Sequence, residues 1–428
     1  MSKFSVVFPE TNRVLGKSLC IPPIRAKKRA WVCCFISLLL CPLAAAALDP
    51  ALDAPDIGSR AAVVLDAVTG TILYGKNMDE EISPASLTKL MTIHLVLREA
   101  AARGVSLEEV RELPRESWAV NQPPRSSLMF IGPGQRASIR DLLLGLAVPS
   151  GNDAAVAAAL LFFPSVEDFT REMNREARFL GLTKTRFTEP SGISEYNITT
   201  AREFALFCRE YLRLHPEILE GFHSVREFAY PKPANVGEAF RNRPNTITQR
   251  NHNTLLDRVE GVDGLKTGYI DEAGYHIALT AERGGTRFIV VILGAPAEYG
   301  GDRIRNADGE NLLAWAFAHY KTLRPPPPDI PPARVWKGKT NSLELLPGEA
   351  LECTALTGQG EGLRWEIEGQ DPVIAPVAAG DPLGELVLYD KAGELRRIPL
   401  LAASDIDRGS FFKRLRDTIR LFFRNLFG

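Results

Sequence analysis

The spacing of apolar and polar positions divides the chain into segments with different periods. Residues 61–74 predict two strands around a turn near Val68–Gly70. From about Ser86 to Ala102, apolar side chains fill most faces of a helix, which is typical of a buried central helix. Further helical patterns follow at residues 139–147, 153–163, 166–180 and 200–213.

A second group of strands follows these helices. Gly261 to Leu293 has the pattern of strands, with a turn at Gly284-Gly285, and a last helical pattern runs from about residue 306 to 320. Strands at both ends with helices between them favour an α+β fold, in which helices flank an antiparallel sheet. We assign this domain to residues 58–323.

The chain changes character after this domain. Residues 324–334 are rich in proline, which cannot continue a helix and favours extended chain, so we interpret them as a semi-rigid linker. Residues 335–403 alternate apolar and polar positions between Gly and Pro turns, which predicts a small all-β domain.

Both ends of the chain carry targeting patterns. Basic residues at 25–29 precede an apolar run from Trp31 to Ala47 that closes in four alanines. This pattern predicts a secretory signal over residues 1–47, with cleavage after Ala47; an uncleaved membrane anchor is the alternative.

The last segment, residues 404–428, predicts an amphipathic helix. One face gathers apolar side chains: Phe411, Phe412, Leu415, Ile419, Phe422, Phe423, Leu426 and Phe427. Lysine and arginine lie between them, which suits a membrane interface with anionic headgroups. A helix docked on the protein's own surface is the alternative.

Composition excludes several classes of function. The chain has 428 residues and a net charge of −1, so nothing indicates a nucleic-acid partner. Four of its six cysteines lie in the leader, which leaves Cys208 and Cys353 far apart and predicts no disulfide framework. The six histidines are scattered, so we expect neither a metal site nor a cofactor.

Candidate chemistry begins at the buried helix. Ser86 and Lys89 are one turn apart on the same helix face. A serine hydroxyl needs a base to take its proton, and a lysine can be that base when burial lowers its pKa. Apolar neighbours of Lys89 make that desolvation plausible. Taken alone, the pair also fits a capping serine with a surface lysine.

Two further segments complete a set of motifs. Ser150 and Asn152 flank a glycine in a predicted loop, and Lys266, Thr267 and Gly268 lie on a predicted strand. Taken alone, the Ser150 segment also fits a loop with a helix cap, and the Lys266 segment also fits an exposed edge strand. Their order after the Ser86 motif matches the SxxK, SDN and KTG set of penicillin-binding proteins and class A β-lactamases. The order favours the functional interpretation.

The chain resembles the low-molecular-mass penicillin-binding proteins that act as D-alanyl-D-alanine carboxypeptidases, over roughly residues 58–428. The resemblance rests on segments around the motifs: 84–92, 127–130, 150–154, 249–253, 262–268 and 271–275. It implies a β-lactamase/transpeptidase-like fold with a small β-sandwich domain, a substrate ending in D-Ala-D-Ala, and acylation by β-lactams. It also implies an exported enzyme, peripheral on the periplasmic face of the cytoplasmic membrane.

The resemblance also implies a role for each motif residue. Ser86 is the nucleophile, Lys89 the general base, and Ser150 the proton donor to the leaving D-alanine. Asn152 holds the substrate amide and positions Lys89. The list of expected substrate-binding residues is Lys266, Thr267, Gly268 and Tyr269, with the backbone N–H groups of Ser86 and Tyr269 as oxyanion hole.

This sequence departs from the family at Tyr269, where histidine is common, at Pro149, where glutamine is usual, and in a longer segment 229–246. The oxyanion contact uses the backbone, so we expect activity to survive at Tyr269; its effect on deacylation is open.

Three other functions fit parts of the sequence. A class A β-lactamase would need a Glu-x-x-x-Asn element after the second motif, which Glu189-Pro-Ser-Gly-Ile193 does not supply. A peptidoglycan endopeptidase would use the same site with a different cleft. A non-enzymatic wall-binding scaffold would have no need for the intact motif residues.

Overall fold

The computed structural model describes residues 53–242, 244–298 and 300–427. The predicted signal segment, residues 1–47, lies outside the described residues. The described chain begins with strands β1 (Ala61–Asp66) and β2 (Ile72–Lys76). A short 3-10 turn at Ala85–Thr88 follows and leads directly into helix α1 (Lys89–Arg103).

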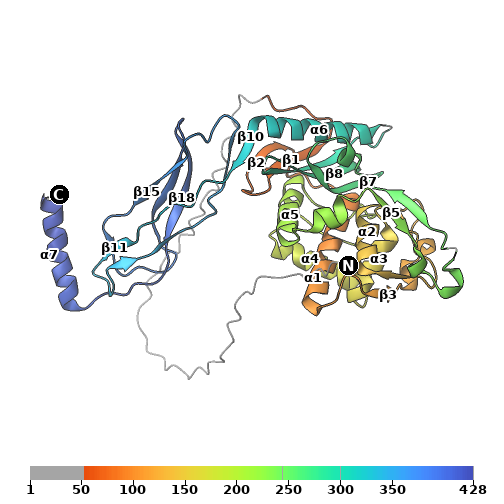
Figure 1. Ribbon diagram of the computed structural model, residues 1–428, viewed down its shortest axis with the longest axis horizontal. Helices are drawn as coiled ribbons and strands as arrows, with labels where there is room; N and C mark the ends of the chain where they lie inside the picture. Colours follow the sequence, from red (N-terminus) through yellow and green to blue (C-terminus); the bar gives the residue numbers. More distant parts are fainter. Residues whose placement is uncertain (1–52, 243, 299, 428) are drawn as a thin grey trace, which may run out of the picture. The chain divides into compact units, whose positions relative to one another are not determined.

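Helices fill the middle of this first domain (Figure 1). They are α2 (Ile139–Ala147), α3 (Asn152–Phe162), α4 (Val166–Phe179) and α5 (Ala201–Leu214). Two small hairpins flank them, β3 (Val110–Glu112) with β4 (Arg136–Ser138) and β5 (Glu227–Tyr230) with β6 (Ile247–Arg250). Ser138 begins α2 with a reciprocal capping box to Asp141, as the preference for serine at helix starts predicts.

The central sheet has five antiparallel strands in the order β2-β1-β9-β8-β7. Its later strands are β7 (Val262–Ile270), β8 (Gly274–Arg283) and β9 (Thr286–Ala295), and helix α6 (Gly301–His319) follows. Both sheet faces are covered, by α6 on one side and by the layer of helices α1 to α5 on the opposite side (Figure 1). The predicted α+β class is therefore confirmed.

Alternation along the strands explains how one sheet supports two cores. On β1, Val63 and Leu65 pack into the larger core with α1 to α5, whereas Ala62 and Val64 pack into the smaller core under α6. Successive side chains in a strand point to opposite faces, so a sheet buried on both sides needs apolar residues at every position. The unbroken apolar run of β1 is the result.

The remaining strands belong to the C-terminal part of the chain. Their bounds are β10 (Tyr320–Leu323), β11 (Ala333–Trp336), β12 (Ser342–Leu343), β13 (Leu345–Pro347), β14 (Cys353–Leu356), β15 (Arg364–Gly369), β16 (Val373–Ile374), β17 (Pro382–Tyr389) and β18 (Glu394–Ala402). A four-stranded sheet β13-β18-β17-β15 and a three-stranded sheet β12-β11-β16 contribute to one core. The predicted all-β domain is thus present, although β14 pairs with β10, a partner that local patterns did not indicate.

The chain ends in helix α7 (Phe411–Phe427). Its apolar aromatic side chains are exposed, and Asp417 and Leu421 are its buried residues. None of the helices in the described part of the chain is both long enough and apolar enough to span a bilayer.

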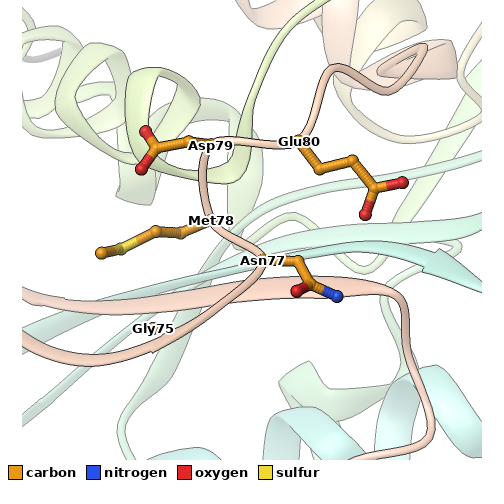
Figure 2. A pocket seen from close by; sticks show the side chains of 5 residues that line it. All are labelled: Gly75, Asn77, Met78, Asp79 and Glu80. Atoms are coloured by element: carbon orange, nitrogen blue, oxygen red, sulfur yellow. The ribbon is translucent and has the colours of Figure 1, made fainter.

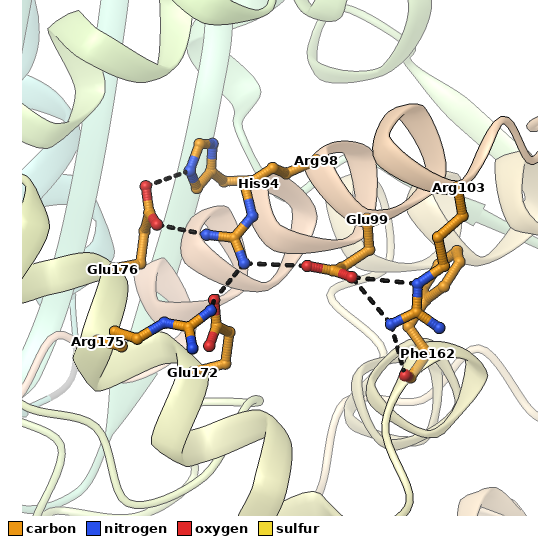
Figure 3. Close-up of polar contacts among 8 residues, drawn as sticks. All are labelled: His94, Arg98, Glu99, Arg103, Phe162, Glu172, Arg175 and Glu176. Atoms are coloured by element: carbon orange, nitrogen blue, oxygen red, sulfur yellow. Dashed lines mark hydrogen bonds and ion pairs between the residues drawn. The ribbon is translucent and has the colours of Figure 1, made fainter. Parts of the chain in front are cut away.

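An ion-pair network fixes α1 against α4 (Figure 3). Arg98 on α1 bonds to both Glu172 and Glu176 on α4, and His94 lies 3.1 Å from Glu176. Both glutamates are buried, so their charges need these partners. The network holds in place the helix that carries the candidate base, Lys89.

Candidate active site

The turn that carries Ser86, the candidate nucleophile, is a strained piece of backbone just before α1. Ala85 has a positive φ of 47° and Ser86 follows it in the 3-10 turn, so the regular helix begins at Lys89 rather than at Ser86. The Ser86 side chain remains partly exposed while its neighbours are buried. Such strained positions are common where a side chain must be presented to substrate.

Lys89 is fully buried next to Ser86. Its Nζ donates to Ser86 Oγ at 2.9 Å, to Asn152 Oδ1 at 2.8 Å and to the Ser191 carbonyl at 2.5 Å. Burial lowers the pKa of Lys89 from 10.5 to about 7, against the opposing effect of the Glu189 and Asp153 carboxylates. Neutral Lys89 keeps two N–H groups, which can bond to Asn152 Oδ1 and the Ser191 carbonyl, and its lone pair is then left for the Ser86 hydroxyl. In that neutral state Lys89 can accept the Ser86 proton.

The second motif lies between α2 and α3. Ser150 has a positive φ of 62°, and its buried Oγ has no hydrogen-bond partner among the residues that the structure describes. Asn152 is the first residue of α3, and its backbone N–H donates to the Ser127 carbonyl at 2.8 Å. The motif therefore contributes one side chain that is bonded to Lys89 and one hydroxyl that is free to act.

Asp153 fixes this motif to the preceding loop. Its carboxylate accepts the backbone N–H groups of Met129 at 2.7 Å, Ile131 at 3.0 Å and Ala154 at 2.9 Å. Its burial raises the pKa of the Asp153 carboxyl, and these backbone hydrogen bonds oppose that rise. The segment 127–130, part of the family resemblance in sequence, is thereby held beside the second motif.

The third motif lies on β7, directly against the nucleophile turn. A Cβ placed on Gly268 would lie 3.1 Å from both the Pro84 carbonyl oxygen and the Ser86 backbone nitrogen. Only a residue without a side chain lets the strand come this close without displacing the turn. Lys266 and Thr267 are buried just before this point of contact.

Arg305 is a site residue that the motifs did not reveal. It lies on α6, is only 6% exposed, and its hydrogen bonds go to Asn306 Oδ1 on its own helix. Burial lowers the pKa of Lys266 well below its usual value, and the charges of Lys89 and Arg305 lower it further. The charge of Arg305 therefore acts on Lys266 through space.

Within the described ranges, neither Lys266 nor Arg305 has a carboxylate within ion-pair distance, and no cluster of His, Cys, Asp or Glu could hold a metal ion. The sequence gives no signal for Arg305, because it stands in a mostly polar segment with Arg303 and Asn306 as neighbours. Its approach to the third motif depends on tertiary packing and is visible only in the structure.

Tyr269 lies at the mouth of the site and is 39% exposed. Its hydroxyl donates to Asp271 Oδ1 at 2.6 Å, and its ring lies 4.3 Å from that of Tyr275. The hydrogen bond to Asp271 raises the pKa of Tyr269 to about 12. Tyr269 therefore stays protonated at neutral pH, unlike a histidine at the same position.

A pocket elsewhere on the domain has no part in this chemistry (Figure 2). Its lining residues are Gly75, Asn77, Met78, Asp79 and Glu80. Arg202 donates to both oxygens of Asp79 at 2.8 Å, and no residue of the three motifs lines the pocket.

The fold and the site, with a buried lysine bonded to a partly exposed serine, are those of a serine-type peptidase. The chain belongs to the D-alanyl-D-alanine carboxypeptidase family, whose model matches residues 49–297, as the sequence resemblance predicted. A second family model, for the C-terminal domain of penicillin-binding protein 5, matches residues 329–408.

Individual relatives agree with this assignment. D-alanyl-D-alanine carboxypeptidase DacC of Escherichia coli K12 is 34% identical over 397 residues, which cover 91% of this chain and 94% of that protein. Penicillin-binding protein 5 from Haemophilus influenzae has a similar structure, with a TM-score of 0.71, 29% identity, and coverage of 83% and 99%. Penicillin-binding protein D2 from Listeria monocytogenes, solved in a cefotaxime-bound form, gives a TM-score of 0.52, 31% identity, and coverage of 61% and 98%.

Proposed function

We propose that the chain removes the terminal D-alanine from peptidoglycan stem peptides by way of an acyl-enzyme on Ser86. The observation that carries this proposal is a pair of buried basic groups: Lys266, on the strand that contacts the Ser86 turn, and Arg305, whose charge acts on Lys266. A buried charge without a partner is unfavourable, so such a site favours a ligand that brings a negative charge. The free carboxylate of a terminal D-alanine supplies that charge.

Carboxylate recognition also sets the position of the cleaved bond. Gly268 brings β7 against the Ser86 turn, so a carboxylate bound at Lys266 and Thr267 leaves the penultimate carbonyl near Ser86. Protonated Lys266 is disfavoured in the free site because burial lowers its pKa. An entering carboxylate offsets that effect and favours the charged form.

Acylation follows from the contacts of Lys89. Neutral Lys89 takes the proton of Ser86 across the 2.9 Å contact as the hydroxyl oxygen attacks the carbonyl. Asn152 Oδ1 orients Lys89, and its amide group binds the substrate backbone. The backbone N–H groups of Ser86 and Tyr269 stabilise the developing oxyanion.

The leaving D-alanine needs a proton on its nitrogen. Ser150 is suited to deliver it, because its buried hydroxyl has no partner among the described residues. Water then hydrolyses the ester on Ser86. β-Lactams acylate the same serine, since they present a carbonyl and a carboxylate to the same groups.

A β-lactamase with a glutamate base is the rival reaction, and Glu189 is a glutamate whose charge acts on Lys89 and that could serve it. Both oxygens of Glu189 already accept hydrogen bonds from Ser191 and Gly192. A carboxylate committed in this way is not available to activate a water molecule. We therefore expect slow release of β-lactams.

One experiment tests the function. Mature protein is incubated with labelled penicillin and, separately, with a pentapeptide ending in D-Ala-D-Ala, and Ser86→Ala is the matched control. We expect covalent label and released D-alanine with the wild type and neither with the variant. Absence of both from the wild type would refute the proposal, and rapid loss of the label would favour a β-lactamase.

We further propose that the mature enzyme works outside the cytoplasmic membrane and is held to its surface by α7. The leader and the family assignment support export. The exposed apolar residues of α7 support surface binding: Phe411, Phe412, Leu415, Ile419, Phe422, Phe423, Leu426 and Phe427 are all 48% exposed or more. A helix docked by its apolar face would bury these residues instead.

Vesicles that contain anionic lipid test the anchor. Phe422→Asp places a charge on the apolar face, whereas Asn425→Asp adds the same charge at an exposed polar position. We expect the first variant to lose sedimentation with vesicles and the second to keep most of it. Equal binding by both variants would show that α7 does not insert its aromatic face.

A further inference from the structure

A turn outside the three motifs encloses the nucleophile and its base. A Cβ placed on Gly192 would lie 1.8 Å from the Ala85 carbonyl oxygen, so this turn is in direct contact with the strained backbone before Ser86. The Ser191 carbonyl accepts the 2.5 Å hydrogen bond from Lys89 Nζ. The position of this turn therefore sets one of the three contacts of the base.

The carboxylate of Glu189 organises the turn from within. Its Oε2 accepts the backbone N–H of Ser191 at 2.6 Å and the Ser191 hydroxyl at 2.5 Å. Its Oε1 accepts the backbone N–H groups of Gly192 at 2.6 Å and Ser194 at 3.4 Å, and the Asn197 amide at 3.0 Å. Hydrogen bonds to an ionised acceptor are shorter and stronger than neutral ones, so a single side chain holds the whole turn.

We propose that Glu189 is a positioning residue for the general base: it holds the Ser191 carbonyl on Lys89, and its charge stabilises the ammonium that forms when Lys89 takes the Ser86 proton. This inference rests on the proposed acylation of Ser86 and adds to it a residue outside the three motifs. Glu189 acts through Lys89 and the turn, without contact to substrate.

The charge of Glu189 matters because Lys89 is buried. Two carboxylates act on Lys89, those of Glu189 and Asp153. Its basic neighbours are Lys266 and His252. Glu189 is the first of the two carboxylates that raise the pKa of Lys89, against the larger effect of burial. The ammonium forms during acylation, so stabilising it favours the reaction.

Asp153 differs from Glu189 in its contacts. Its carboxylate is bonded to backbone N–H groups of the opposite loop, at Met129 and Ile131. Glu189 is bonded to the same residue, Ser191, whose carbonyl contacts Lys89. Glu189 therefore both positions the Ser191 carbonyl on Lys89 and places a negative charge near it.

The test measures acylation by labelled penicillin between pH 5 and 10 for Glu189→Gln. Loss of the carboxylate's hydrogen bonds should lower the acylation rate at every pH, because a glutamine amide cannot accept all of them. We expect the plateau of the rate to fall about tenfold or more. Loss of the negative charge should move the acid limb of the pH profile to lower pH, by roughly half a unit to one unit, because removal of the anion lowers the pKa of Lys89. The KM for the pentapeptide should stay within about twofold, since Glu189 does not bind the carboxylate.

Glu195→Gln is the matched control, since it removes the same charge from an exposed position of the same segment. We expect its profile to overlay that of the wild type. Glu189→Asp retains the charge on a shorter side chain, so its plateau should fall while its acid limb stays in place. This variant also keeps the inference testable if Glu189→Gln does not fold.

The outcomes separate this inference from the proposed function. A wild type that is not acylated would refute the function itself. A wild type that is acylated, together with a Glu189→Gln profile of unchanged rate and midpoint, would refute the role of Glu189 alone. A lower rate with an unchanged midpoint, or an Asp variant that shifts the midpoint as Gln does, would overturn the electrostatic part and leave a packing role.

Discussion

A negative charge placed beside Lys89 should move acylation to higher pH. Burial lowers the pKa of Lys89 from 10.5 to about 7. At 1.36 kcal/mol per unit, this shift corresponds to about 5 kcal/mol that disfavours the ammonium. It leaves about half of the lysine neutral at pH 7, where an exposed lysine would be less than about 0.1% neutral. Wild-type acylation should therefore rise with pH and level off above about 7.

Asn152→Asp is the perturbation that tests this reasoning. Asn152 Oδ1 lies 2.8 Å from Lys89 Nζ, and the substitution adds a charge with almost no change of shape. An opposite charge at this range raises a pKa by about one to three units. At pH 7 the neutral fraction of Lys89 should then fall about fivefold for a one-unit shift and about fiftyfold for a two-unit shift.

The assay is the second-order rate constant for labelling by penicillin between pH 5.5 and 10, with thermal unfolding measured over the same range as a control for folding. The acid limb of Asn152→Asp should lie at least one unit above that of the wild type, on a lower plateau because the substrate amide loses a donor. A variant that is slower at every pH with an unmoved midpoint would refute the reasoning. So would a wild-type midpoint near 10, because burial would then have no effect on the base.

Three further substitutions test the surroundings of the site. Asp153→Ala leaves three buried backbone N–H groups without an acceptor, and urea unfolding should show a loss of about 3 kcal/mol or more. Gly192→Ala places a Cβ 1.8 Å from the Ala85 carbonyl at a φ of +81°, so penicillin labelling should fall at least about a hundredfold even where circular dichroism shows a folded protein. Tyr269→Phe removes the hydrogen bond to Asp271 and keeps the backbone N–H of the oxyanion hole, so acylation should change by less than about threefold in the same labelling assay.

Local patterns predicted the elements of the fold well where one period dominates. The apolar run of β1 and the largely apolar helix after Ser86 were both visible, because burial on more than one face leaves few polar positions. The pairing of β14 with β10 was not visible. An alternating pattern shows that a segment is a strand, but a strand's partner depends on chain geometry beyond the local sequence.

The C-terminal helix shows a similar limit to prediction from local sequence patterns. The four- and three-residue spacing predicted an amphipathic helix, and α7 covers that segment. In the sequence Asp417 was only one negative charge among many arginines. In the structure it is buried and accepts the Lys337 backbone N–H at 2.9 Å. A carboxylate that bonds to backbone in this way has no sequence signature, because the donor can come from any residue.

The same distinction applies to the active site. The residue types at Ser86, Lys89 and Lys266 show which groups can react, since nucleophile, base and carboxylate ligand need particular atoms. They do not show which groups are reactive at neutral pH. That depends on burial and on partners such as the Ser191 carbonyl and Arg305, which belong to segments without a motif. A homologue could therefore keep all three motifs and still be a poor enzyme, if the turn at Ser191 no longer contacted Lys89 or if water reached its Nζ.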